Sequence, residues 1–390
     1  MEPKIRFSSS NILYEEKTLS EISTINPKTN VPLEFEYVDL ESVSGTEMTN
    51  HRTEHKATAP SRAQRLAKKG DIFYQTVRPY QKNNYYFDMD DDNYVFSTGY
   101  AQIRPSIYGK YLFTLLQNDS FLKQVLDNCA GTSFPAINPS VLSRLSVRIC
   151  KDKQEQQAIA SYFTSLDSQI SASTSRLASL KQMKAASLQA MFPQEGEAVP
   201  KIRFKGFEGE WKKVKLGKLF SERIENNVDG EMLSVTMNNG IIKAAENGRF
   251  DNSNSDKSKY KVVKVGDIAY NSMRMWQGAS GCSQYEGIVS PAYTVVVPNA
   301  NIHSLFFAYL FKTIPMINLF RLHSQGLTKD TWNLKYPAFS IIEVSYPESK
   351  AEQQAIATYF TSLDRQISLQ SQRLEKLKQI KSACLDKMFV

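Results

Sequence analysis

One long segment of this 390-residue chain occurs twice, and this repeat constrains the fold more than any other feature. Residues 155–167 read EQQAIASYFTSLD, and residues 352–364 read EQQAIATYFTSLD, 197 positions further on. The same offset joins the pentapeptide PKIRF at residues 3–7 to PKIRF at residues 200–204. A period this long lies far outside the range of solenoid repeats, so it predicts a duplicated domain rather than a repeat array.

Each copy of the repeated segment has the apolar pattern of a long helix. The apolar side chains follow one another at steps of four and three residues, which is the spacing of a heptad seam. The seams consist of Ile159, Phe163, Leu166, Ile170, Leu177 and Leu180 in the first copy and Ile356, Phe360, Leu363, Ile367, Leu374 and Leu377 in the second. Ser173 and Gln370 interrupt both seams at the same step. So narrow a stripe needs a partner, so we expect an antiparallel coiled coil between the two helices; an ordinary bundle core is the alternative.

The residues at the ends of the repeat agree with a helix. Asp152 and Glu155 have the three-residue spacing of a capping box, and so do Ser349 and Glu352. Pro193 ends the first helix, because the residue before a proline avoids helical dihedral angles. A helix over residues 155–191 is about 55 Å long at ~1.5 Å per residue.

The segments between the repeats diverge and have the pattern of mixed α/β domains. Short alternating or apolar runs bounded by Gly, Pro, Asn and Asp predict strands, and a few longer runs predict helices. The strands include residues 72–77, 94–96 and 293–297, and the helices include 108–118 and 305–314. We expect an α+β fold with pseudo-twofold internal duplication, divided as follows: a first domain at 1–150, a first long helix at 151–193, a second domain with its lead-in at 194–347 and a second long helix at 348–390.

Basic residues are concentrated in one part of each domain, although the net charge of the chain is only +8. Residues 52–82 carry eight basic and two acidic side chains, and residues 243–274 carry seven and four. Lys and Arg suit phosphates, and Arg and Gln suit base edges. The candidate DNA-binding residues are Ser61, Arg62, Arg65, Lys68, Lys69, Tyr74, Thr76, Arg78 and Lys82, together with Lys257, Lys259, Lys261, Tyr270, Ser272, Arg274 and Gln277. A solvated basic face is the alternative, so charge alone leaves nucleic-acid binding open.

A Gly-Asp-Ile motif begins a predicted strand in both domains. In the first domain Tyr74, Thr76 and Arg78 follow Gly70-Asp71-Ile72 at alternate positions, and in the second Tyr270, Ser272 and Arg274 follow Gly266-Asp267-Ile268. Alternate residues of a strand share one face. We therefore expect a phosphate-facing strand at the same place in both domains.

Several motifs that suggest catalysis or metal binding fail on inspection. His51 and His55 match the HxxEH pattern of inverted zinc hydrolases, but their flanks are polar and Pro60 follows, whereas that motif needs a buried helix. The run from Asp88 to Asp92 lacks the glycine and the glutamate of a calcium loop. Phosphate-binding loops, dinucleotide fingerprints and serine elbows are absent from the sequence. We expect no catalytic residue, no metal and no cofactor.

The spacing of the cysteines and the length of the apolar runs indicate the cellular compartment of the protein. The four cysteines are far apart in sequence: Cys129, Cys150, Cys282 and Cys384. This spacing predicts no disulfide framework, as expected for a protein in a reducing cytoplasm. The longest apolar run, 305–311, is too short to cross a bilayer, and the N-terminus has no secretory signal pattern. We expect a cytoplasmic protein without a membrane partner.

The repeated helix, its PKIRF lead-in, the GDIxYxxxR motif of each domain and the SRAQR segment at 61–65 together resemble the DNA-specificity subunits of type I restriction-modification systems. The resemblance covers essentially the whole chain. It implies that each variable domain is a target recognition domain for one half of a split site in double-stranded DNA. It further implies that the paired helices set the spacer between the halves. It also implies that two methyltransferase subunits dock on the shared regions and that restriction/translocase subunits join them. The specificity subunit itself is then expected to catalyse nothing.

This chain departs from a perfect duplication in ways that affect the second domain. Cys150 of the first half stands where the second has Pro347, and Lys257, Lys259 and Lys261 stand in place of the SRAQR segment. Two other functions remain possible from sequence alone. The chain could be a two-headed coiled-coil scaffold without DNA selectivity, or a hydrolase that binds zinc through its HxxEH motif.

Overall fold

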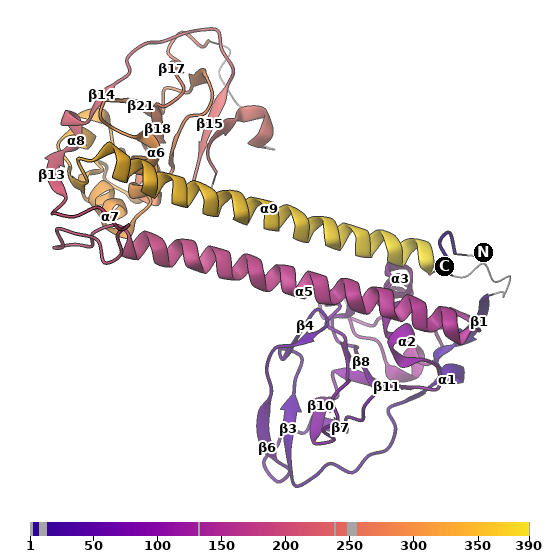
Figure 1. Cartoon of the computed structure of the whole chain (residues 1–390). Helices are drawn as coiled ribbons and strands as arrows, with labels where there is room; N and C mark the ends of the chain where they lie inside the picture. The colour runs from indigo at the N-terminus through magenta and orange to yellow at the C-terminus, as the bar shows by residue number, and fades with distance from the viewer. Residues whose placement is uncertain (1–2, 8–13, 132, 238, 248–255, 390) are drawn as a thin grey trace. The chain divides into compact units, whose positions relative to one another are not determined.

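The computed structural model describes residues 3–7, 14–131, 133–237, 239–247 and 256–389 (Figure 1). The chain divides into two compact units, one formed by Met1–Ser175 with Gln372–Val390 and the other by Arg176–Ser371. Two long helices contribute one end to each unit: α5 (Lys153–Ala190) and α9 (Lys350–Met388). Both helices lie inside the ranges that the sequence predicts for them.

Two four-stranded sheets build the variable domain of the first unit. The central sheet is antiparallel and has the order β2 (Ser23–Ile25), β11 (Tyr100–Pro105), β8 (Ile72–Gln75), β9 (Tyr85–Tyr86). The outer sheet has the order β6 (Arg52–His55), β3 (Glu34–Val38), β10 (Tyr94–Ser97), β7 (Ala63–Leu66), with β3 and β10 parallel. The short helices are α1 (Leu19–Ile22), α2 (Gly109–Leu115), α3 (Asp119–Asp127) and α4 (Pro139–Leu142).

The second unit repeats the central sheet and changes the outer part. Its central sheet is antiparallel in the order β14 (Phe220–Glu222), β21 (Tyr293–Pro298), β18 (Ile268–Asn271), β19 (Ser280–Cys282). The outer part has two short ladders, β15 (Leu233–Thr236) with β16 (Gly240–Lys243) and β17 (Lys261–Val263) with β20 (Gly287–Val289). Its short helices are α6 (Ser304–Leu310), α7 (Ile314–His323) and α8 (Tyr336–Ser340).

The two units therefore share a frame. In each, an antiparallel ladder joins the start of the variable domain to the strand before the long helix, β1 (Tyr14–Thr18) with β12 (Ser146–Cys150) and β13 (Lys212–Lys215) with β22 (Glu343–Tyr346). The mixed α/β duplication expected from the repeat is present. No single described helix is both long and apolar enough to cross a membrane; α6 and α7, bent by 82°, pass that test of length and composition only as a pair.

The structure explains why PKIRF is repeated together with the helix. Arg6 of the first copy donates two hydrogen bonds, at 3.0 and 2.6 Å, to the carboxylate of Glu155 in the first turn of α5. Arg203 binds Glu352 of α9 in the same way, at 2.7 and 2.8 Å. Both glutamates are almost completely buried. A buried carboxylate needs a charged, hydrogen-bonded partner, so the lead-in arginine and the helix glutamate form one structural feature in each unit.

Within each unit, segments of α5 and α9 contact each other in opposite chain directions. In the first unit Asp167 pairs with Lys381 at 2.6 Å, and the Tyr162 hydroxyl lies 3.4 Å from the sulfur of Cys384. In the second, Lys184 pairs with Asp364, and the Ser187 hydroxyl lies 2.8 Å from that of Tyr359. The residue numbers fall along α9 as they rise along α5, so these contacts are antiparallel.

The apolar ends of each long helix enter a domain core. Phe192, just after α5, lies 5.8 Å from Phe360 of α9 between ring centroids, and Phe389 lies 6.1 Å from Phe163 of α5. None of the twelve predicted seam residues is exposed. Those buried are Ile159, Phe163, Leu166, Leu180, Ile356, Phe360 and Leu363, and those half-buried are Ile170, Leu177, Ile367, Leu374 and Leu377.

Candidate nucleic-acid interface

The Gly-Asp motif of each domain forms a tight turn before the central strand. The backbone N–H of Asp71 donates to the carbonyl of Lys68 at 2.9 Å, and that of Asp267 donates to the carbonyl of Lys264 at 3.0 Å. The intervening glycine has a φ of +95° in the first turn and +91° in the second. A side chain at that position would be strained, which explains the glycine in both motifs.

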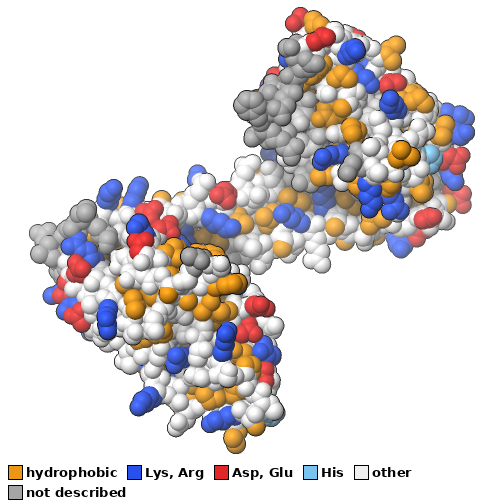
Figure 2. Space-filling model, turned by 180° about the vertical axis from the view of Figure 1, so that it is seen from behind, with side chains coloured by type: hydrophobic (Ala, Val, Ile, Leu, Met, Phe, Trp, Pro, Cys, Tyr) orange, Lys and Arg blue, Asp and Glu red, His pale blue; other side chains and the backbone are white. Residues whose placement is uncertain are grey.

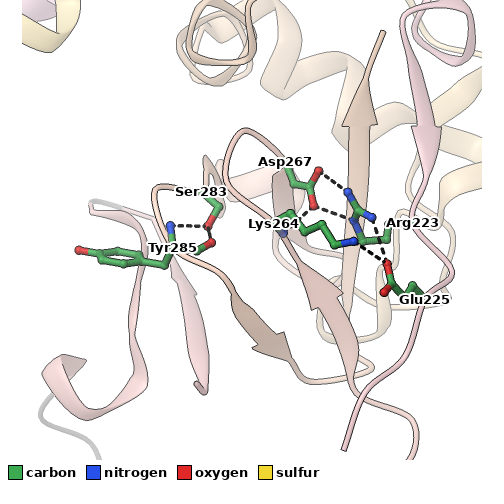
Figure 3. Close-up of polar contacts among 6 residues, drawn as sticks. All are labelled: Arg223, Glu225, Lys264, Asp267, Ser283 and Tyr285. Atoms are coloured by element: carbon green, nitrogen blue, oxygen red, sulfur yellow. Dashed lines mark hydrogen bonds and ion pairs between the residues drawn. The ribbon is translucent and has the colours of Figure 1, made fainter. Parts of the chain in front are cut away.

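The aspartate of each motif closes the turn and binds an arginine. Asp71 accepts two hydrogen bonds from Arg104, at 2.7 and 2.8 Å, and one from the backbone N–H of Lys68 at 2.8 Å. Asp267 accepts the same set from Arg223, at 2.7 and 2.9 Å, and from the N–H of Lys264 at 2.8 Å (Figure 3). The hydrogen bond to Asp267 raises the pKa of Arg223. The aspartates are buried and fully engaged, so they stabilise the domains and do not face a ligand.

The two arginines come from different strands. Arg104 belongs to β11, in the middle of the central sheet, whereas Arg223 directly follows the edge strand β14. The backbone N–H of Arg223 donates to the carbonyl of Val295, and that of Asn26 donates to the carbonyl of Gln102. Val295 and Gln102 have the same place in the strand register, so Asn26 is the first unit's equivalent of Arg223. In the second unit the position equivalent to Arg104 is Val297, by the strand register. The ion pair is retained while its cation has changed strands.

The prediction of a phosphate-facing strand is wrong for its hydroxyl residues. Tyr74 and Tyr270 lie in the hydrophobic cores with about 1% and 0% of their surface exposed. Thr76 is also buried and donates to the carbonyl of Gly99 at 2.8 Å, and Ser272 shares a hydrogen bond with Thr294. The central strand is covered on both faces, so the alternation of side chains along it does not separate a solvent-exposed face from a buried one.

Acidic neighbours neutralise part of the predicted basic stretches. Lys69 pairs with Asp90 at 2.6 Å, and Lys82 pairs with Asp119. In the second domain Lys261 approaches Glu222 at 3.3 Å. Surface pairs of this kind contribute little stability, but each reduces the charge available to a polyanion. Figure 2 shows acidic side chains interspersed among the Lys and Arg side chains of the visible face.

The other predicted contacts differ in exposure. Lys68 is exposed within the turn before β8, and Ser61 and Arg62 are exposed just before β7. Arg65 is half-buried, and burial lowers its pKa. Lys259 is exposed and Lys257 half-buried. The exposed members could reach a phosphate directly, whereas a contact by Arg65 requires DNA to meet the edge strand β7.

Arg78, Arg274 and Gln277 lie beyond the end of the central strand. Arg274 and Gln277 are exposed, and the guanidinium of Arg78 lies 4.6 Å from the ring centroid of Phe134. The sequence alone did not identify Phe134 or Gln81 as candidate contacts. Gln81 is the first domain's equivalent of Gln277. Aligning the domains on their Gly-Asp turns would have identified Gln81.

Comparison with known proteins identifies the duplicated pattern. A family model described as the type I restriction modification DNA specificity domain matches residues 11–182 and again residues 208–379. The type I restriction enzyme HindI specificity subunit of Haemophilus influenzae is 34% identical over 139 residues. That match covers 34% of this chain and 30% of the relative, so it spans about a third of each protein.

Solved structures share the fold at low sequence identity. The S subunit of a type I restriction-modification system from M. genitalium has a TM-score of 0.65 at 16% identity, with 100% of this chain and 99% of that chain covered. A chain from a structure of type I R-M complex assembly has a TM-score of 0.54 at 19% identity, with 98% of both chains covered. These likenesses concern the fold alone.

Proposed function

The chain belongs to the type I restriction modification DNA specificity family, and on that premise we propose that it is the DNA sequence-recognition subunit of a type I restriction-modification complex. One observation carries the proposal: the family model matches twice, and each match covers one variable domain and most of the long helix after it. Two such domains read two short sequences. In this proposal the first recognition domain spans residues 1–150 and the second 194–347.

The long helices serve as the spacer in this proposal. We infer that α5 and α9 form one antiparallel coiled coil and that its length sets the number of unspecified base pairs between the two half-sites. The antiparallel contacts inside each unit and the burial of the seam residues support it. A helix of about 55 Å, less its overlapping ends, can separate two domains by about one DNA turn (~34 Å), so that both meet the same side of the duplex.

Dividing the target between two domains is sufficient for useful specificity. Each correct base pair contributes about 1–3 kcal/mol of discrimination, and the contributions of separated positions roughly add. Six or seven specified pairs, in two groups, therefore distinguish a target from random DNA. The spacer adds a constraint on distance without requiring contacts to the intervening bases.

The partners and the catalytic chemistry follow from the same family membership. We propose that two methyltransferase subunits bind the duplicated frame in equivalent positions, because internal twofold symmetry offers the same surface twice. Restriction/translocase subunits would join them. Methylation and cleavage then belong to the partner subunits, in the cytoplasm, and the present chain supplies recognition.

Mapping of methylated sites tests this proposal. The full chain is co-expressed with the methyltransferase subunit of the same system in a host without other modification, and the methylated positions of the host DNA are sequenced. We expect one motif with two short specified parts and a gap of fixed length. Cells that express the methyltransferase alone are the control and should lack it. Absence of any motif in the presence of both subunits would favour the scaffold alternative, and stoichiometric zinc in the purified chain would favour the hydrolase.

A further inference from the structure

In both domains a short turn with an arginine first, an aromatic residue third and a glutamine fourth follows the central strand. The first reads Arg-Pro-Tyr-Gln-Lys over residues 78–82, and the second reads Arg-Met-Trp-Gln-Gly over residues 274–278. In both, a 3-10 helix begins directly after the arginine, at Pro79–Gln81 and Met275–Gln277. We call these segments the first and the second arginine turn. They recur in domains whose sequences otherwise diverge.

The backbone of the first arginine turn has an uncommon conformation at two residues. Arg78 and Lys82 have φ angles of 54° and 55°, in the left-handed region, and Asn26 is the only other non-glycine residue there among those that the structure describes. Side chains with a Cβ atom adopt this region at a cost of about 1–2 kcal/mol each. In the second turn the position of Lys82 is taken by Gly278, with a φ of 80°. Strain of this kind persists where the surroundings enforce it, and it clusters at functional sites.

A lysine anchors each arginine turn to the helix beneath it. In the first domain Lys82, in the turn, donates to the backbone carbonyl of Gln117 after α2 at 3.3 Å. In the second domain Lys312, after α6, reaches the other way and donates to the carbonyl of Gly278 in the turn. Lys312 also donates to the carbonyl of Ser280 at 2.9 Å, and burial lowers its pKa to about 8. The anchor is therefore present in both domains, from opposite partners, and it holds each turn in place.

An exposed loop lies against the first arginine turn. We call residues 133–137 the first tip loop. Two backbone hydrogen bonds hold it: the N–H of Arg78 donates to the carbonyl of Pro135 at 2.8 Å, and the N–H of Ile137 donates to the carbonyl of Thr76 at 3.0 Å. The side chain of Phe134 projects from it with 63% of its surface exposed. The guanidinium of Arg78 packs over that ring.

The second domain places a longer loop at the same position. The second tip loop, residues 324–334, is held by the N–H of Leu334, which donates to the carbonyl of Ser272 at 2.8 Å. Its apolar tip, Leu327, is completely exposed. The rings of Trp276 and Trp332 meet edge to face at a centroid distance of 5.4 Å and join the loop to the second arginine turn.

The arginine charge of each arginine turn is available to a ligand. Among the described residues, neither Arg78 nor Arg274 forms an ion pair, whereas Lys69, Lys82 and Lys261 of the predicted basic stretches do. Arg binds phosphates or guanine edges, Gln binds adenine edges, and an exposed apolar side chain contacts the thymine methyl group. These are the side-chain types that the arginine turns and the tip loops present together.

We propose that the two arginine turns are a common DNA anchor of the recognition domains and that the adjoining tip loops determine which bases each domain reads. The inference rests on the DNA-recognition function proposed above. A feature common to both domains cannot distinguish two different half-sites, so the turns supply the shared contact. The tip loops differ in length and in exposed side chain, so they supply the difference.

The test uses the full chain with the methyltransferase subunit of the same system, after the methylated motif has been mapped. Phe134→Ala and Leu327→Ala truncate the two tips. We expect each to relax the preference at one position of a different half-site by roughly tenfold and to leave the other half-site unchanged. Ile224→Ala is the matched control, because Ile224 is also strongly exposed (81%) but lies outside the turn and the loop. It should leave both half-sites unchanged.

Arg78→Ala and Arg274→Ala test the anchor by binding to duplexes that carry the mapped motif or a scrambled one. We expect roughly tenfold weaker binding to both duplexes, with a salt dependence reduced by about one phosphate contact. If the chain directs no motif at all, the proposed function fails. If a motif is mapped and both tip variants leave it unchanged, or each alters both half-sites, the present inference fails while the function stands. Unchanged affinity of both arginine variants would likewise remove the anchor.

Discussion

Moving the arginine of the buried ion pair from one strand to another is the most direct test of how the two domains are related. Asp267 is bound by Arg223 in the second unit, and the equivalent Asp71 by Arg104 in the first. Asp267→Asn removes the charge and keeps the shape, and it leaves the Arg223 guanidinium, whose side chain is 15% exposed, without its main partner. Removing one member of a buried pair costs about 3–5 kcal/mol. We expect the lower end, about 3 kcal/mol, because Glu225 still contacts Arg223 and water reaches part of the guanidinium.

The chain carries its own reporter for the second unit. All three tryptophans, Trp211, Trp276 and Trp332, lie within it. Urea unfolding followed by tryptophan fluorescence therefore observes the second unit selectively. With an m-value of about 2–3 kcal/mol/M, the loss of 3 kcal/mol lowers the midpoint of that transition by roughly 1–1.5 M. Asp71→Asn is the matched control, and it should move the tryptophan transition by less than half as much, because it perturbs the first unit.

The relocation itself uses two positions of the second unit. Arg223→Asn should destabilise the second unit about as much as Asp267→Asn. Val297 is the register equivalent of Arg104 and is half-buried as Arg104 is. The double variant R223N/V297R therefore places a guanidinium opposite Asp267 on the middle strand, as in the first unit. We expect it to recover at least half of the lost stability. A double variant no more stable than Arg223→Asn, or an Asp267→Asn midpoint within about 0.3 M of the parent, would refute the reasoning.

Three further predictions concern recognition. Deleting one heptad from the middle of both α5 and α9 shortens each helix by about 10 Å, or about three base-pair steps. Methylome sequencing should therefore find a shorter spacer between unchanged half-sites. An unchanged spacer would contradict the proposed role of the helices. Exchanging residues 205–346 for the corresponding domain of another family member should alter one half-site in the mapped motif, and a change in both would contradict modular reading. Arg62→Ala should weaken DNA binding and lower its salt dependence, and Arg65→Ala should weaken it less, because Arg65 is half-buried; equal affinity of parent and variants from low to high salt would exclude this segment from the interface.

The long helices could be predicted because their pattern is local. The steps between Ile159, Phe163 and Leu166 and their repetition 197 residues later define both the helix and its apolar face. The same information does not say what the first glutamate of each helix does. Its spacing from Asp152 indicates a cap, yet Glu155 binds Arg6 from a segment 149 residues away. Contacts that join distant segments leave no periodic signal in a sequence.

The central strand shows the opposite limit of sequence reasoning. Alternation predicted that Tyr74 and Thr76 share a surface with Arg78, but alternation identifies a solvated face only where the sheet has one. Both faces of β8 are covered, and all four of its residues are buried. Arg78 and Arg274 leave the core because they lie beyond the ends of β8 and β18, where the short 3-10 helices begin. The end of the central strand therefore separates the core from the candidate interface, and no glycine marks that end in the first domain.

Comparison of the two domains by hydrogen-bond register shows more duplication than comparison by identity. The ion pair at the Gly-Asp turn survives with its cation moved from Arg104 to Arg223, and the anchor of the arginine turn survives with its lysine moved from Lys82 to Lys312. Neither arginine nor lysine aligns with its counterpart, so a search for identical residues misses both contacts. What is retained is a charged group at each contact, and for the ion pair the reason is that an unpaired buried aspartate is costly wherever its partner originates. Equivalence of this kind identifies the parts of a recognition domain that must stay rigid, and it leaves the tip loops as the parts that are free to vary.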